Sequence, residues 1–224
     1  CALWVPSAPA GAWVSSLGMR RVNVVGTSGS GKATFGTELA RRLDVPHVEL
    51  DGLSWEATWV TVPTPVFRER VSAAVAADRW VVDGNYSATR DLVWARADTV
   101  VWLDFLFALV MWRVIVRTLR RGLRGEVLWS GNRESLRMAI SRDSIILWAL
   151  TTYHRRRRDY PRLFQMYPGV RFVRLQSPAQ ARRFLDAIGP PAPAVESPER
   201  SRPGPRSANS PAGGATTSGA PGRQ

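Results

Sequence analysis

The sequence predicts an α/β fold, a three-layer sandwich in which helices cover both faces of a five-stranded parallel sheet. Short β-branched and apolar runs alternate along the chain with amphipathic helical patterns, and such alternation is typical of parallel sheets with right-handed crossovers. Several of these runs also end directly on glycine or aspartate. Because ligands bind at the carboxyl ends of parallel strands, these endings predict a functional site at that edge of the sheet.

The expected strands are short, rich in valine and bounded by Gly, Pro or Asp, as buried strands commonly are. They comprise residues 21–25, 47–50, 80–82, 99–103 and 170–173. Phe35, Leu39 and Leu43 recur at helical spacing after the first strand, which predicts a helix with one apolar face. A similar pattern predicts a helix over about 66–75.

The second half of the sheet is expected to carry longer helices. One helix follows the fourth strand and runs to about residue 121, and residues 122–168 have a mostly helical, basic pattern. Ser177 precedes the last helix as its N-cap, and Gln180 completes a capping box. The chain has no internal repeat.

Composition divides the chain into three parts. Residues 1–19 lack the basic start of a signal peptide, and we expect them to be a disordered extension. Residues 20–188 are expected to form one domain, with a helical lid at about 113–160. Residues 189–224 are dominated by Pro, Ser, Gly, Ala and Arg, and such a segment cannot offset its ordering entropy, which predicts a disordered tail.

Charge, hydropathy and cysteine content restrict the possible partners and the cellular location. The net charge of +13 favours polyanionic partners such as nucleotides, nucleic acid or acidic surfaces. Asp104 and Arg113 interrupt the most apolar stretch, so no membrane span is expected. The single cysteine, Cys1, excludes an internal disulfide framework and is compatible with a cytoplasmic location.

The most informative motif lies between the first strand and its helix. The sequence there has the Gly-x-x-x-x-Gly-Lys pattern of a phosphate-binding P-loop (Walker A). Lys32 in this motif is the only lysine of the chain, whose other basic residues are all arginine. A slim ammonium fits a glycine-lined cradle better than a planar guanidinium does. The expected ATP-binding residues are Gly26, Thr27, Ser28, Gly29, Ser30, Gly31, Lys32, Ala33 and Thr34.

Ala33 departs from this pattern. A Ser or Thr usually follows the lysine and its hydroxyl ligates Mg²⁺, whereas Thr34 comes one residue later and is rotated by roughly 100° on the helix. Either Mg²⁺ is held through water and carboxylates, or the site is weakened.

Three aspartates follow strands, and we expect them at the same edge. Asp83 is the first candidate for ordering Mg²⁺; the alternative is that it only forms a turn with Gly84. Asp104 is a second metal candidate, and the alternative is that it caps the following helix. Asp51 is expected to orient or deprotonate an acceptor hydroxyl, against an ordinary loop aspartate. His47 and His154 have no ligand-like spacing, so no zinc site is expected.

Arginines are expected to neutralise a transferring phosphate from the lid. The candidates are Arg117, Arg121, Arg133 and Arg137; for any one of them the alternative is a solvated basic face. Residues 155–158 are four arginines, which we interpret as surface, with nucleic-acid contact as a lesser alternative.

Four segments together resemble the adenylate-kinase-like P-loop proteins known as topology modulation proteins, in their actinobacterial branch. They are residues 24–32, 49–55, 80–86 and 97–104, supported by 131–134 and 142–150. The resemblance covers roughly residues 20–188. It implies a P-loop NTPase fold of nucleoside-monophosphate-kinase type, ATP with Mg²⁺, and a helical lid. Asn85, Tyr86 and Ser87 stand where adenylate kinases have Phe-Pro-Arg after Asp-Gly, and Arg90 comes later. This difference does not favour AMP as acceptor.

The sequence thus predicts a kinase that transfers the γ-phosphate of ATP to a small molecule or nucleotide. The alternative is a nucleotide-binding regulatory protein with weak or no ATPase activity, which Ala33 supports. The pattern does not identify the acceptor or the oligomeric state.

Overall fold

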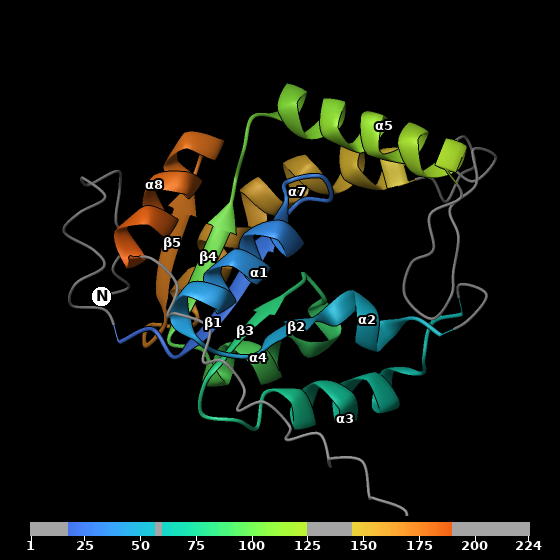
Figure 1. The fold of residues 1–224 in the computed structure, drawn as a ribbon. Coiled ribbons are helices and arrows are strands. Elements are labelled where there is room, and N and C mark those ends of the chain that lie inside the picture. Colours follow the sequence, from blue (N-terminus) through green and yellow to red (C-terminus); the bar gives the residue numbers. More distant parts are fainter. Residues whose placement is uncertain (1–17, 57–59, 125–144, 190–224) are drawn as a thin grey trace, which may run out of the picture. The chain divides into compact units, whose positions relative to one another are not determined.

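The computed structural model describes residues 18–56, 60–124 and 145–189 (Figure 1). Within these residues the chain forms a five-stranded sheet in the order β2-β3-β1-β4-β5, and all pairs are parallel. The strands are β1 (Arg21–Gly26), β2 (His47–Glu49), β3 (Trp80–Asp83), β4 (Thr99–Leu103) and β5 (Arg171–Leu175). The predicted α/β fold with five parallel strands is therefore confirmed.

Strand β1 lies at the centre of the sheet, and its valines are buried. Continuous apolar runs are what a strand covered on both faces requires. Its register pairs Val24 with Asp83 of β3 and Gly26 with Leu103 of β4. The carboxyl ends of β1, β3 and β4 therefore meet at one edge of the sheet, as the sequence predicts.

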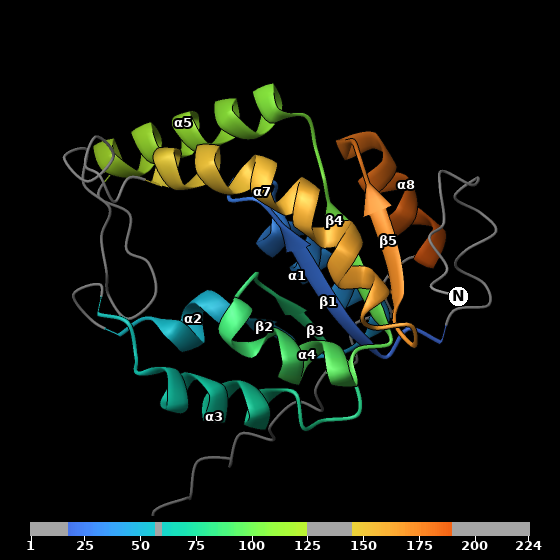
Figure 2. The same ribbon diagram turned by 180° about the vertical axis from the view of Figure 1, so that it is seen from behind.

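Helices cover both faces of the sheet. They are α1 (Lys32–Leu43), α2 (Leu50–Ser54), α3 (Thr64–Ala74), α4 (Arg90–Arg96), α5 (Phe107–Arg124), α7 (Ile145–Gln165) and α8 (Pro178–Ile188), with a 3₁₀ turn, η3 (Ser87–Thr89), before α4. Buried residues of α1 and α8 pack on one face together with Tyr153 of α7 (Figure 1). Those of α3, α4 and the later part of α7 pack on the other (Figure 2). This arrangement of helices, sheet and helices is the predicted three-layer α/β sandwich.

Strand β2 and the connection after it differ from expectation, whereas helix α8 begins as expected. The second strand ends at Glu49, and Leu50 begins the short helix α2, so Asp51 lies in a helical turn rather than at a strand end. Ser177 caps α8 as predicted, since its hydroxyl accepts a hydrogen bond from the amide of Gln180.

Among the described residues, no helix is both long and apolar enough to cross a membrane.

The expected lid is described in part. Helices α5 and α7 run side by side in both views (Figures 1 and 2). Residues 125–144, with Arg133 and Arg137, lie outside the described residues, as do 1–17 and 190–224. The disordered extension and tail therefore stay predictions.

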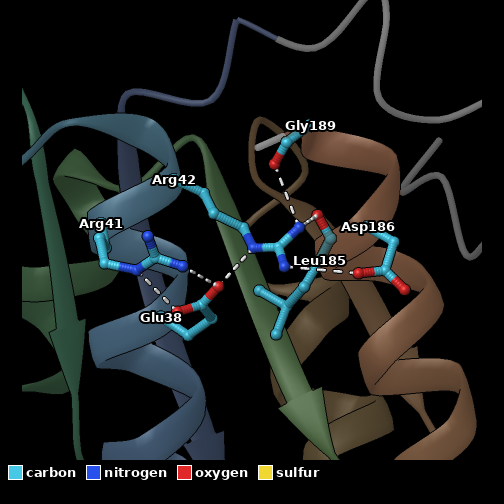
Figure 3. Close-up of polar contacts among 6 residues, drawn as sticks. All are labelled: Glu38, Arg41, Arg42, Leu185, Asp186 and Gly189. Atoms are coloured by element: carbon cyan, nitrogen blue, oxygen red, sulfur yellow. Dashed lines mark hydrogen bonds and ion pairs between the residues drawn. The ribbon is translucent and has the colours of Figure 1, made fainter. Parts of the chain in front are cut away.

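A small polar network joins helices α1 and α8 (Figure 3). Glu38 of α1 accepts hydrogen bonds from Arg41 and Arg42. Arg42 also donates to the carbonyl oxygens of Leu185 at 2.6 Å and Gly189 at 3.1 Å. A guanidinium has several donors in a fixed fork, and here it stabilises the carboxyl end of α8 against α1.

This network predicts a pH-dependent contribution to stability. Hydrogen bonds from Arg41 and Arg42 lower the pKa of Glu38 to about 2 from an ordinary value of 4.5. Because the folded pKa is lowered, the contribution is fully present above the unfolded pKa and is lost as pH falls toward 2. Urea unfolding at pH 6 should show Glu38→Gln less stable than the unchanged protein by about 1 kcal/mol, and the difference should shrink steadily toward pH 3. A difference that stays constant over this range would contradict the assignment.

Candidate functional site

The loop between β1 and α1 has the backbone geometry of a phosphate cradle. Gly29 and Gly31 have φ angles of 83° and 87°, which residues with a side chain rarely adopt. The amide of Ser30 donates to the carbonyl of Thr27 at 3.0 Å and closes the turn. Helix α1 then begins at Lys32, so its first-turn amides and positive dipole end face the loop.

Helix α5, which belongs to the region predicted as a lid, packs directly against this loop. A Cβ atom added at Gly29 would lie 2.5 Å from Cγ2 of Val114 and 2.9 Å from the carbonyl oxygen of Val110. Glycine at this position is therefore required by packing as well as by its φ angle. A Cβ at Gly31 would lie 3.8 Å from a guanidinium nitrogen of Arg113, which places a positive charge beside the cradle.

Lys32 is partly buried and lies among charged groups of both signs. Burial is the main cause that lowers the pKa of its ammonium; the charges of Asp51 and Asp83 oppose this effect. The charges of Arg156 and Arg117 add to the lowering. The loop lysine thus lies within electrostatic reach of two of the predicted aspartates and one of the predicted lid arginines.

The side chain of Asn85 fastens this loop to the end of β3. Its Oδ1 accepts from the amide of Gly26 at 2.9 Å, and its Nδ2 donates to the carbonyl of the same residue. Tyr160 of α7 donates to the same Oδ1 at 3.2 Å. One amide side chain therefore satisfies both backbone groups at the point where β1 ends and the loop begins.

Asp83, the predicted metal residue, is buried and lies beside β2. Its Oδ2 is 2.8 Å from Nε2 of His47, and the other ring nitrogen of His47 lies 3.3 Å from the hydroxyl of Thr37. His47, Glu49 and Asp83 each place one possible ligand atom within 4.8 Å of the others. The sequence does not indicate this grouping, because it depends on the pairing of β2 with β3.

Asp51, the predicted acceptor residue, is held by a short chain of hydroxyl groups. Tyr86 donates to Oδ1 of Asp51 at 2.7 Å, and the hydroxyl oxygens of Tyr86 and Ser54 are also 2.7 Å apart. Burial, followed by the charge of Asp51, raises the pKa of Tyr86 above its usual range. The phenol therefore stays protonated and keeps one carboxylate oxygen in a fixed direction.

Asp104, the second metal candidate, lies between two guanidinium groups. Its Oδ2 accepts from Arg174, and its Oδ1 is 3.1 Å from Nε of Arg157. Burial raises the pKa of this carboxyl, and both arginines oppose the shift. Both oxygens are thus engaged by cations, which would compete with a metal ion, so its role as a metal ligand stays a prediction.

The arginines divide differently from the prediction. Of the expected set, Arg117 is near Lys32, Arg121 belongs to the described backbone of α5, and Arg133 and Arg137 lie outside the described residues. Arg156 lies close enough to Lys32 to affect its pKa, although we expected residues 155–158 at the surface.

Helical spacing divides these arginines into rows, and the orientation of α7 decides which row faces Lys32. Thr152, Arg156 and Tyr160 recur every four residues on α7, and Arg156 donates to the Thr152 hydroxyl at 3.2 Å. Tyr153 and Arg157 form a second such row, with Arg157 donating to the Tyr153 hydroxyl at 3.1 Å. A run of four arginines on a helix therefore presents different members to different partners.

No protein-family model and no curated protein matches the chain. Among solved structures, it is similar to a shikimate kinase from Acinetobacter baumannii in complex with shikimate: 17% identity, 80% of this chain, 94% of that chain and TM-score 0.48. A gluconokinase from Sinorhizobium meliloti 1021 is 17% identical, with 75% of this chain and 91% of that chain covered and a TM-score of 0.45. A shikimate kinase from Bacteroides thetaiotaomicron is 15% identical, with 76% of this chain and 96% of that chain covered and a TM-score of 0.45. At these low values the likeness has no bearing on function, and the resemblance to topology modulation proteins stays a prediction.

The fastening of the loop by Asn85 can be tested by substitution. Asn85→Ala leaves the amide and carbonyl of Gly26 without their side-chain partner, which should lower the unfolding free energy by about 1–3 kcal/mol. Binding of ATP, measured by calorimetry, should weaken as well, because the start of the loop is no longer fixed. Ser87→Ala, at an exposed position on the same connection, is the control. Unchanged ATP affinity in Asn85→Ala would show that the loop holds its shape without this join.

Proposed function

We propose that this chain is an ATP-dependent phosphotransferase that moves the γ-phosphate of ATP to a small acceptor. The observation that carries the proposal is the electrostatic coupling of Lys32 to both Asp51 and Asp83 at the start of a glycine cradle. A phosphate-binding ammonium with two nearby carboxylates is the arrangement that phosphoryl transfer requires.

The cradle fits the phosphates of ATP. The buried hydroxyl of Ser30 has no hydrogen-bond partner among the described residues, and buried polar groups normally have one. The first-turn amides of α1 and the ammonium of Lys32 supply positive charge on the same side. Arg113 beside Gly31 would add a further cation close to the phosphate oxygens.

The carboxylates at the strand ends fit a hydrated Mg²⁺ ion. Glu49 and Asp83 offer the oxygen ligands that this ion prefers, with Asp83 as the residue that orders its water shell. When bound, the ion would neutralise part of the phosphate charge. Ala33 has no hydroxyl to offer, so the strand-end carboxylates would take over that part.

Asp51 is proposed to act on the acceptor. Held through Oδ1 by Tyr86, it takes the proton from the acceptor hydroxyl as the hydroxyl oxygen forms its bond to the γ-phosphorus of ATP. The bond from that phosphorus to the bridging oxygen breaks, and ADP leaves. Lys32, Arg117 and Arg156 bring positive charge to the oxygens of the transferring group.

The second candidate is a nucleotide-binding regulatory protein with weak or no ATPase activity. Ala33 favours it, since the position after the lysine offers no hydroxyl to a metal ion. The two candidates differ in turnover: a regulator would bind ATP without acceptor-stimulated consumption.

The proposal predicts that ATP consumption depends on Lys32 and on an acceptor. In a screen of nucleosides, nucleotides and small metabolites, the right acceptor should raise ATP consumption, and Lys32→Ala should lower the stimulated rate about a hundredfold or more. Lys32→Arg should behave similarly, because the planar guanidinium does not fit the cradle. Arg182→Ala, at an exposed position on α8, is the control for folding. If no acceptor raises consumption above the Lys32→Ala level, the regulator is the better description.

Ala33 gives a separate prediction about the metal. Ala33→Thr restores a hydroxyl at the first turn of α1, and the Mg²⁺ concentration for half-maximal ATP binding or turnover should fall severalfold. Thr34→Ala, at the exposed neighbouring position, should leave that concentration unchanged. An unchanged metal dependence in Ala33→Thr would refute a metal role for this position.

A further inference from the structure

Helix α5 packs one apolar face against the rest of the described fold. Val110 and Val114 on this inner face are 1% and 0% exposed, and both lie next to Gly29 of the glycine loop. Helix α7 runs along another side of α5 (Figures 1 and 2). The core and the loop therefore account for the apolar residues on the inner face.

A second apolar row lies on the outer face of α5. Its four large side chains follow the i, i+3, i+4, i+7 spacing of one helix face; they are Trp112, Ile115, Val116 and Leu119. Trp112 and Val116 are each two residues from Val114, which turns them about 200° away from the inner face. The four side chains are 62%, 40%, 43% and 50% exposed. Single exposed apolar residues are ordinary, whereas a continuous row on one helix face is typical of a surface that binds a partner.

The charged residues of this helix all have the same sign. Every charged residue of α5 is an arginine, and none is acidic. Arg120 directly follows Leu119, is exposed, and forms no ion pair within the part of the chain that the structure describes. Exposed Trp, Ile, Val and Leu side chains combined with arginines are typical of helices that lie flat in the interface of a lipid bilayer.

Two other kinds of partner fit the outer face less well. A second copy of the chain would bring the arginines of two α5 helices together, with no acidic residue on either helix to pair with them. A nucleic acid would pair with the arginines and could stack a base on Trp112, but Ile115, Val116 and Leu119 offer no ring for stacking. An anionic bilayer accommodates both features, because apolar side chains enter the acyl boundary while arginines stay among the headgroups.

We propose that the outer face of α5 binds the surface of an anionic phospholipid bilayer, with the helix parallel to the membrane plane. Trp112 and Leu119 are the main apolar contacts, because they are the most exposed of the four, and a tryptophan ring favours the boundary between apolar chains and headgroups. Arg120 contacts the lipid phosphates. The glycine loop packs on the inner face of the same helix, so membrane binding and the proposed phosphotransfer use different side chains and are independent of each other.

Vesicle sedimentation with the full chain tests this proposal. Vesicles of phosphatidylcholine alone are compared with vesicles that also contain about one third phosphatidylserine, at about 0.1 M salt. The partition coefficient should be about tenfold higher for the anionic vesicles.

Substitutions on the outer face separate this surface from the general positive charge of the chain. Trp112→Gln and Leu119→Gln should each lower the partition coefficient on anionic vesicles about fivefold, because less apolar area enters the bilayer. Met166→Gln is the matched control, since Met166 is 70% exposed but lies just after α7, and it should change the coefficient less than about twofold.

The charge is tested in the same way. Arg120→Gln should lower the coefficient on anionic vesicles about fivefold and leave weak binding to neutral vesicles unchanged. Arg182→Gln, at an exposed position on α8, should stay within about twofold. All five positions are exposed, and thermal unfolding followed by circular dichroism should show the same midpoint for every variant.

Four results would overturn the proposal. The first is no binding to anionic vesicles, and the second is binding that Trp112→Gln and Leu119→Gln leave unchanged, which would reduce the attraction to net charge. The third is a dimer in sedimentation velocity that Leu119→Gln dissociates, which would assign the outer face to a second copy of the chain. The fourth is tighter binding of a single-stranded oligonucleotide than of vesicles, weakened by Trp112→Gln, which would assign the face to nucleic acid.

Discussion

The join between Asn85 and Gly26 is the constraint on which the rest of the site depends. Through one amide side chain, the end of β3 satisfies both backbone groups of the residue where β1 gives way to the glycine loop. The residues on either side of Asn85 take their positions from the same turn. Asp83 reaches His47 on β2, and Tyr86 reaches Asp51 on α2. The tetrapeptide from Asp83 to Tyr86 thus relates the glycine loop, the proposed metal-binding edge and the proposed acceptor residue to each other.

Burial and neighbouring charges affect Lys32, Arg156 and Asp104 in different ways. Lys32 and Arg156 both have lowered pKa values because burial penalises their charged forms, and the aspartates offset this only for Lys32. Positive groups that are held together before a ligand arrives need no reorganisation when charge develops on a transferring phosphate. Asp104 shows a different arrangement, since this buried carboxylate already forms ion pairs with Arg157 of α7 and Arg174 of β5. These ion pairs join α7 and β5 to the end of β4.

Much of the fold could be predicted from the sequence because its signals are local. The valine-rich strands, the N-cap at Ser177 and the glycine spacing around Lys32 each lie within a few residues of chain. The predicted capping box forms only in part, because the side chain of Gln180 accepts from the amide of Gln176 and not from that of Ser177. The contacts of the site depend on which strands are neighbours and on which way a helix turns. The pairing of His47 with Asp83 needs β2 beside β3. That Arg156 and Arg157 have different partners depends on the orientation of α7. Asp51 lies in the helical turn α2, whereas the sequence predicts a strand that ends just before it.

The solitary lysine has a consequence for chemical access to this protein. Lys32 carries the only lysine ammonium in 224 residues, and burial lowers the pKa of this group. An acylating reagent that reaches lysine side chains would therefore modify the phosphate loop and no other lysine. The chain thus carries a single lysine reporter at the glycine loop, and protection of Lys32 by a bound molecule, measured separately from the terminal α-amino group, would report occupancy directly.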